Sequence, residues 1–181
     1  MKSIISDVET WLDDVVIGLN LCPFAAIPRK NNQVRFVVSQ ALTEEVLLAD
    51  LHAELTFMSK TPALEVETSL LIVPDLLAKF DYYNQFLDLV DNLLEAFEWE
   101  GIFQIASFHP DYCFAETDPD SVENLTNRAP YPILHIIREE SLEKALEKMT
   151  SPDEIYKRNI QTMNELSAEQ TKALFPYLHF S

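Results

Sequence analysis

Hydrophobic positions near the start of the chain repeat at the spacing of one helix face. The apolar side chains of this segment are Ile4, Ile5, Val8, Trp11, Leu12, Val15, Val16 and Leu19. Separations of three and four residues are typical of an amphipathic helix with one buried side. Pro23, which lacks a backbone donor, follows shortly after this pattern stops. The sequence therefore predicts a helix over residues 3–19.

Four short runs of β-branched, aromatic and aliphatic residues alternate with amphipathic segments along the rest of the chain. The runs cover residues 34–39, 68–73, 102–108 and 133–137. Runs of this length and composition are typical of strands. Because strands that alternate with helices indicate an α/β fold, we expect a layered α/β sandwich. Its small sheet, about four-stranded and mixed or mostly parallel, is packed by helices.

The order of these elements predicts a single domain over residues 1–181. It comprises the N-terminal helix, an α/β core over 33–149, and C-terminal helices over 152–174 that pack on the core. Right-handed crossover connections make the first three strands parallel, whereas the long loop after residue 108 leaves the direction of the fourth strand open. Polar residues that follow parallel strands are expected at one edge of the sheet, where such folds usually bind ligands.

The formal net charge of −17 is concentrated in the middle of the chain. Residues 36–127 contain 18 acidic and two basic side chains, a net charge of −16. A chain this acidic repels a phosphate backbone, which argues against nucleic acid as a partner. The apolar runs are too short to cross a bilayer, so no membrane partner is expected. Two cysteines without a signal peptide predict a soluble protein of a reducing compartment, the cytoplasm.

Glycine occurs at two positions, Gly18 and Gly101. A phosphate-binding loop needs several glycines before a helix, so the sequence has neither a Walker-type motif nor a dinucleotide fingerprint. A bound nucleotide would have to be held by other means. The sequence leaves the cofactor unknown.

The stretch SFHPDYCF, residues 107–114, brings together an imidazole, a carboxylate, a phenol and a thiol directly after the third predicted strand. His109 titrates near neutral pH, and we consider it as a general acid or base that Asp111 orients. Cys113 is the third candidate catalytic residue, because a neighbouring imidazole can lower the pKa of a thiol. The alternative is a plain turn, in which Pro110 sets the backbone angle and Asp111 bonds the backbone.

A metal site is a further alternative for the same stretch. The spacing of His109 and Cys113 suits zinc ligands, but no second ligand pair repeats it. We predict no metal, with these two residues as the ligands if one is bound. His135 shares a strand face with apolar residues, which favours a hydrogen-bonded histidine of the core. Both cysteines are expected to be buried apolar thiols, and Cys22 follows a helix end that raises its pKa.

Two asparagine–arginine pairs indicate an anion-binding function. Arg128 follows Asn127 in a proline-bracketed segment, and Arg158 precedes Asn159 on the last predicted helix. A guanidinium presents its donors in a fixed fork that matches carboxylate or phosphate groups. These four residues and Tyr112 are the predicted substrate-binding residues. The alternatives are a salt bridge to the acidic middle for Arg128 and a solvated helix face for Arg158.

Four separated motifs occur in order between about Asp13 and Ile160. They are GLNLCPFA, FQIASFHPDYCFA, TNRAPYPILHIIRE and PDEIYKRNI. Together they resemble the bacterial family known as domain of unknown function 1415. The resemblance implies a stand-alone cytoplasmic protein of unknown activity and carries over no catalytic residues. The chain departs from the pattern of these relatives in having Glu116 in place of glycine and Leu125 in place of tyrosine.

Two functions are compatible with these observations. The first is a small enzyme that acts on a small anionic molecule by acid–base chemistry of His109 and Asp111, with or without a metal. The second is a module that binds a small ligand or a protein partner, since no complete catalytic signature is present and the tail LFPYLHF is apolar. We favour the enzyme, because a structural turn does not need these four reactive groups together. The oligomeric state is left open.

Overall fold

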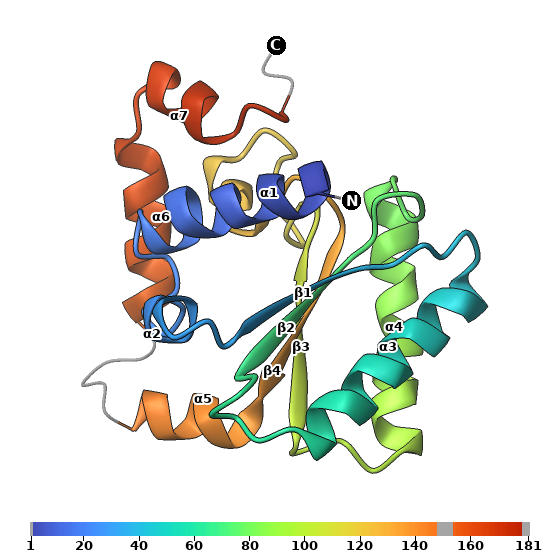
Figure 1. Ribbon diagram of the computed structural model, residues 1–181. Coiled ribbons are helices and arrows are strands. Elements are labelled where there is room, and N and C mark those ends of the chain that lie inside the picture. Colours follow the sequence, from blue (N-terminus) through green and yellow to red (C-terminus); the bar gives the residue numbers. More distant parts are fainter. Residues whose placement is uncertain (1, 148–153, 179–181) are drawn as a thin grey trace.

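The computed structural model describes residues 2–147 and 154–178 (Figure 1). In chain order the elements are α1 (Lys2–Trp11), the π-helical turn η1 (Leu12–Ile17), α2 (Ala26–Lys30), β1 (Val34–Val38), α3 (Glu44–Lys60), β2 (Thr68–Ile72), α4 (Phe80–Ala96), β3 (Phe103–Phe108), the 3-10 helix η2 (Val122–Asn127), β4 (Ile133–Arg138), α5 (Glu139–Leu146), α6 (Glu154–Glu165) and α7 (Ala168–Leu174). The predicted start of the C-terminal helices at residue 152 lies outside the described residues.

The strands form one mixed sheet in the order β1-β2-β4-β3. β1 and β2 are parallel, and β4 is antiparallel to both of its neighbours, β2 and β3. The first three strands therefore run in the same direction, and β4 runs the opposite way between β2 and β3. This confirms the predicted α/β fold with a four-stranded mixed sheet, and it supplies the strand direction that the sequence left open.

Helices cover both faces of the sheet (Figure 1). On one face, Leu51 of α3 and Phe86 of α4 are buried in one cluster with Leu71 of β2. On the other face, Trp11 of α1 belongs to a second cluster with Ile133 of β4, to which η1 and α6 also contribute. Each cluster stabilises its layer by removing apolar surface from water. No helix in the described ranges is long and apolar enough to cross a bilayer.

The N-terminal helix changes its winding after Trp11 and continues as the π-helical turn η1. Here the N–H of Gly18 donates to the carbonyl of Asp13 at 2.9 Å, five residues earlier. A Cβ atom at Gly18 would clash with the backbone carbonyl of Asp14, so the end of the turn requires glycine. The wide turn contributes three buried residues to the core under α1: Leu12, Val15 and Val16.

Strand alternation places a polar side chain on the sheet face under α1. Leu134 and Ile136 of β4 belong to the core under α3 and α4, so His135 between them points to the opposite face. The strand register aligns three further side chains with His135 in one row across the sheet: Phe36, Leu70 and Ala106. The imidazole therefore has the small side chain of Ala106 as its neighbour on β3.

Candidate functional site

His109, the predicted acid–base residue, is fully buried directly after β3. Its Nε2 donates to the carbonyl of Leu77 at 3.0 Å, and its Nδ1 accepts from the backbone N–H of Asp111 at 2.9 Å. Burial lowers the pKa of this imidazole, which favours the neutral form that makes these two bonds. Both ring nitrogens are therefore engaged by backbone groups, and the ring ties the turn to the segment that precedes α4.

Hydrogen bonds to backbone groups hold the turn after β3, as expected for the plain turn that was the alternative to a catalytic site. Asp111 orients His109 with its N–H, and its carboxylate forms no hydrogen bond with the imidazole among the described residues. The N–H of Tyr112 donates to the carbonyl of His109 at 3.1 Å. Asn127 accepts from the N–H of His109 through its carbonyl at 3.2 Å and donates from Nδ2 to the carbonyl of Ser107 at 3.1 Å. These bonds position the loop and leave no free ring nitrogen for proton transfer to a ligand.

Cys113 lies in a loop that is organised by a buried asparagine, Asn124. The Sγ of Cys113 is 3.7 Å from the carbonyl oxygens of Phe114 and Thr117. The Oδ1 of Asn124 accepts from the N–H of Phe114 and from the hydroxyl of Thr117, both at 3.0 Å. Its Nδ2 donates to the carbonyl of Asp118 at 2.9 Å. Sequence reasoning missed Asn124, because a polar residue within a polar loop carries no signal that it is buried.

Replacing Asn124 by alanine is expected to lower the free energy of unfolding by about 2 kcal/mol, because buried polar groups lose their partners. Urea-induced unfolding followed by circular dichroism measures this loss. Asn164→Ala is the matched control, since Asn164 is exposed and bonds the carbonyl of Ile160 within its own helix. The control should change stability by less than about 0.5 kcal/mol. Equal losses in the two variants would contradict an organising role for Asn124.

Arg128 connects the same loop to both ends of the chain. Its guanidinium donates to the carbonyl of Tyr112 at 3.3 Å and to that of Pro119 at 2.7 Å. Its own carbonyl accepts from the indole of Trp11 at 3.0 Å and from the hydroxyl of Tyr177 at 3.2 Å. Within the described ranges it forms no ion pair with an acidic side chain. The guanidinium group of Arg128, which we expected to bind an anion, thus donates to backbone carbonyls of the loop.

The second asparagine–arginine pair binds the loop that follows η1. Arg158 donates to the carbonyl of Asn20, and Nδ2 of Asn159 donates to the carbonyl of Leu21, both at 2.8 Å. The NLCPF motif and the pair on α6 therefore contact each other. Oδ1 of Asn159 is buried and has no hydrogen-bond partner in the described part of the chain.

The predicted site residues thus form two hydrogen-bonded groups, one in the loop between β3 and β4 and one between α6 and the loop after η1. Within residues 2–147 and 154–178, no group of three or more His, Cys, Asp or Glu side chains is placed to hold a metal ion. For a metal at His109 and Cys113, the imidazole has no spare lone pair, because its Nδ1 already accepts a backbone N–H.

Glu116, where the family resemblance implies glycine, has a φ of +64°. Side chains rarely adopt this left-handed region, and they do so at a cost of about 1 kcal/mol. Glycine adopts this backbone conformation without strain, so a glycine at this position would have a conformational reason and would need no anion-binding turn.

A cavity of about 620 Å³ lies on the sheet face under α1. Its floor is the sheet, through Leu70, Ala106 and His135. Its walls come from η1, the loop after it and α5, through Leu12, Val16, Pro23, Phe24, Leu142 and Ala145. The cavity is partly open to solvent, and its volume lies within the range of pockets that bind small ligands. It extends from the first residues of β1 and β2 to Phe108, the last residue of β3, which directly precedes His109.

His135 supplies an imidazole to the floor of this cavity. Its Nε2 lies 2.6 Å from Oγ1 of Thr68, and this hydroxyl lies 2.7 Å from the carbonyl of Ile136, to which it donates. The surrounding protein shields the ring from bulk water and lowers its pKa to about 4, so the imidazole is neutral at pH 7. The hydrogen bond expected of a core histidine is present, and the ring additionally lines the cavity.

Three other titratable side chains line the cavity: Cys22, Glu67 and Lys144. Burial raises the pKa of the Cys22 thiol, so it stays protonated at neutral pH. The sequence predicted this direction from the helix end, whereas desolvation is the main cause in the structure. Lys144 forms an ion pair with Glu140 on α5.

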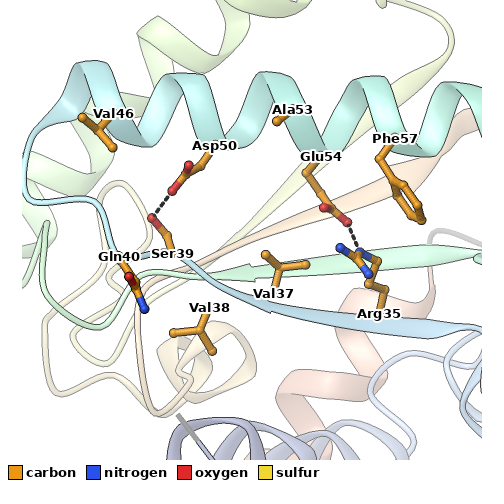
Figure 2. Close-up of a pocket in the computed structure, with 10 residues that line it drawn as sticks. All are labelled: Arg35, Val37, Val38, Ser39, Gln40, Val46, Asp50, Ala53, Glu54 and Phe57. Atoms are coloured by element: carbon orange, nitrogen blue, oxygen red, sulfur yellow. Dashed lines mark hydrogen bonds and ion pairs between the residues drawn. The ribbon is translucent and has the colours of Figure 1, made fainter.

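A second hollow, of about 500 Å³, lies between β1 and α3 (Figure 2). Figure 2 shows two contacts across the hollow, one between Arg35 and Glu54 and one between Ser39 and Asp50. Arg35 donates to Glu54 at 2.7 Å, and Ser39 donates to Asp50 at 2.6 Å. Glu54 also accepts from the buried hydroxyl of Ser69 at 2.6 Å. These contacts join the edge strand to the helix, so we assign this hollow a structural role and take the cavity under α1 as the candidate site.

The chain was compared with curated proteins, with solved structures and with models of protein families. Neither the comparison with curated proteins nor the comparison with solved structures found a match. One family model matches residues 3–173, which is nearly the whole chain, and it confirms the resemblance carried by the four motifs. The chain therefore belongs to the family described as protein of unknown function DUF1415.

Proposed function

We propose that this protein binds a small, mostly apolar molecule in the cavity under α1. This is the small-ligand form of the second function considered from sequence. The observation that carries it is the cavity of about 620 Å³, built by the sheet, η1, the following loop and α5. Ligand pockets are typically of about this size, and they combine mostly apolar walls with a few polar groups that orient the ligand. His135 on the floor is such a group.

Acid–base catalysis on an anionic substrate has less support. The imidazole of His109 is fully buried, with both nitrogens bonded to backbone groups. The guanidinium groups of Arg128 and Arg158 donate to backbone carbonyls. In the described part of the chain, this imidazole and these guanidinium groups thus bond the backbone, and none of these contacts indicates an anion site. The cavity under α1 is a better-supported place for a ligand.

Filling the cavity is expected to weaken the binding of an apolar probe. In wild type, naphthalene should bind saturably and raise the melting temperature, because a ligand that binds the native state stabilises it. Ala106→Leu adds a branched side chain to the cavity floor, and we expect it to weaken naphthalene binding by at least about tenfold, or 1.4 kcal/mol. Fluorescence titration of naphthalene measures the affinity.

Ala53→Leu is the matched control, since Ala53 is exposed on α3 and lies on the other face of the sheet. It adds the same atoms away from the cavity, so naphthalene should bind it as it binds wild type. Unchanged naphthalene binding in Ala106→Leu, or no binding to wild type at all, would refute the proposed function.

A further inference from the structure

The hydrogen bonds around His135 define the chemistry of the cavity floor. The Thr68 hydroxyl has one proton, and that proton goes to the carbonyl of Ile136, which can only accept. At 2.6 Å from His135 Nε2, the Thr68 oxygen must therefore accept, so Nε2 carries the proton. In a neutral imidazole the other nitrogen, Nδ1, is then an acceptor with a free lone pair.

This lone pair has no counterpart in the protein. In the described ranges, 2–147 and 154–178, the hydrogen bond of the His135 ring is made by Nε2. Nδ1 is not one of the fully buried, unpaired polar atoms, so it is accessible where the ring lines the cavity. The ring stands between Leu70 and Ala106 in its row across the sheet, and neither side chain has a donor. The cavity therefore contains an acceptor in a lining that is mostly apolar, with Glu67 and Lys144 as its charged members, and a molecule that occupies the cavity can satisfy it.

From this geometry we propose that the cavity selects a neutral molecule with an apolar body and a hydroxyl group that donates to Nδ1 of His135. This inference rests on the proposed function and names the ligand class. A carboxylate would meet the lone pair with its own negative oxygens and would share the lining with Glu67, while the lysine of the lining, Lys144, is already paired with Glu140. A hydrocarbon would fill the space but leave Nδ1 unpaired. A phenol or an aromatic alcohol satisfies both requirements.

The test compares naphthol, naphthalene and naphthoate, which share one apolar body and differ in the polar group. Wild type should bind naphthol about two- to tenfold more tightly than naphthalene, the range that one additional buried hydrogen bond supplies. Naphthoate should bind more weakly than either. His135→Phe keeps a ring of similar size without the acceptor, and it should bind naphthol and naphthalene equally.

His52→Phe is the matched control. His52 lies on α3, on the other face of the sheet, where its ring packs against Phe97 and Trp99. It should retain the preference for naphthol. A measurement on wild type is independent of the folding of any variant: the ¹⁵N resonance of His135 Nδ1 should shift on addition of naphthol and stay in place on addition of naphthalene.

The outcomes separate this inference from the proposed function. Equal binding of naphthol and naphthalene to wild type, tightest binding of naphthoate, or a preference that survives in His135→Phe would each overturn the hydroxyl assignment while leaving an apolar cavity that binds ligands. Absence of binding for both naphthalene and naphthol would overturn the cavity function itself, and the inference with it.

Discussion

Replacing His109 by alanine is expected to destabilise the protein by about 3 kcal/mol, because the change creates a cavity and leaves buried backbone groups unpaired. The ring has no exposed surface, and its two nitrogens bond the carbonyl of Leu77 and the N–H of Asp111. Ring contacts with Phe80 and Tyr83 are lost as well. The measurement is the free energy of unfolding from urea titration at pH 7.

His52→Ala is the comparison for this experiment. His52 is half-buried on α3 and makes ring contacts with Phe97 and Trp99. Its side chain forms no hydrogen bond within the described part of the chain. Its loss should cost about 1 kcal/mol or less. If the two variants had the same free energy of unfolding, the imidazole of His109 would not stabilise the turn. The hypothesis that His109 is an acid–base residue would then be supported again.

Lowering the pH is expected to remove about 2 kcal/mol of stability between about pH 7.5 and about pH 5 through His135 alone. The folded protein holds the pKa of this imidazole at about 4, below its ordinary value of 6.5. Between these two values the unfolded chain binds a proton that the folded chain rejects. Stability therefore falls as the pH drops through 6.5, and the loss continues until the folded protein is itself protonated near pH 4.

The effect is isolated by measuring the same pH series for His135→Gln, which has no titrating group at this position. The gap in free energy of unfolding between wild type and variant should change by about 2 kcal/mol over this range, in the direction that favours the variant at low pH. Glu67, Lys144 and Cys22 also line the cavity, and all three are present in both proteins. Parallel pH curves for wild type and variant would show that His135 is protonated as readily in the fold as in the unfolded chain.

Much of the fold could be predicted from local patterns. The apolar run at 68–73 became the buried strand β2, and the amphipathic segment after Thr43 became α3, with the Thr43 hydroxyl accepting from the N–H of Val46. These outcomes depend on neighbours a few residues apart, which a single sequence displays. The direction of β4 could not be predicted, because the long loop before it can bring the chain back to the sheet in either orientation.

The candidate site was less accessible to sequence reasoning. We predicted a catalytic site in SFHPDYCF because reactive groups are adjacent there. Adjacency in the sequence does not determine the direction in which each polar atom points. In the fold, His109 bonds the carbonyl of Leu77, more than thirty residues earlier. The signal that did exist was weaker: Ala106 is, with Ser107, a small residue in a strand of larger ones, and His135 is a polar residue among the apolar residues 133–137. Their proximity depends on the pairing of β3 with β4, which neither position reveals.

By itself the sequence determined the strands, the longer helices, the α/β class and the membership of the DUF1415 family, because these follow from periodicity and motifs within short windows. It did not predict the short helices α2 and η2, which lie in segments without a clear hydrophobic period. The tertiary structure alone decided which histidine is sealed by backbone bonds and which one lines a cavity. That difference arises from strand register, from the path of η1 and its loop, and from the position of α5 over the sheet. Hydrogen bonding and burial act between segments that are distant in the sequence, so their chemical consequences appear only when the chain is folded.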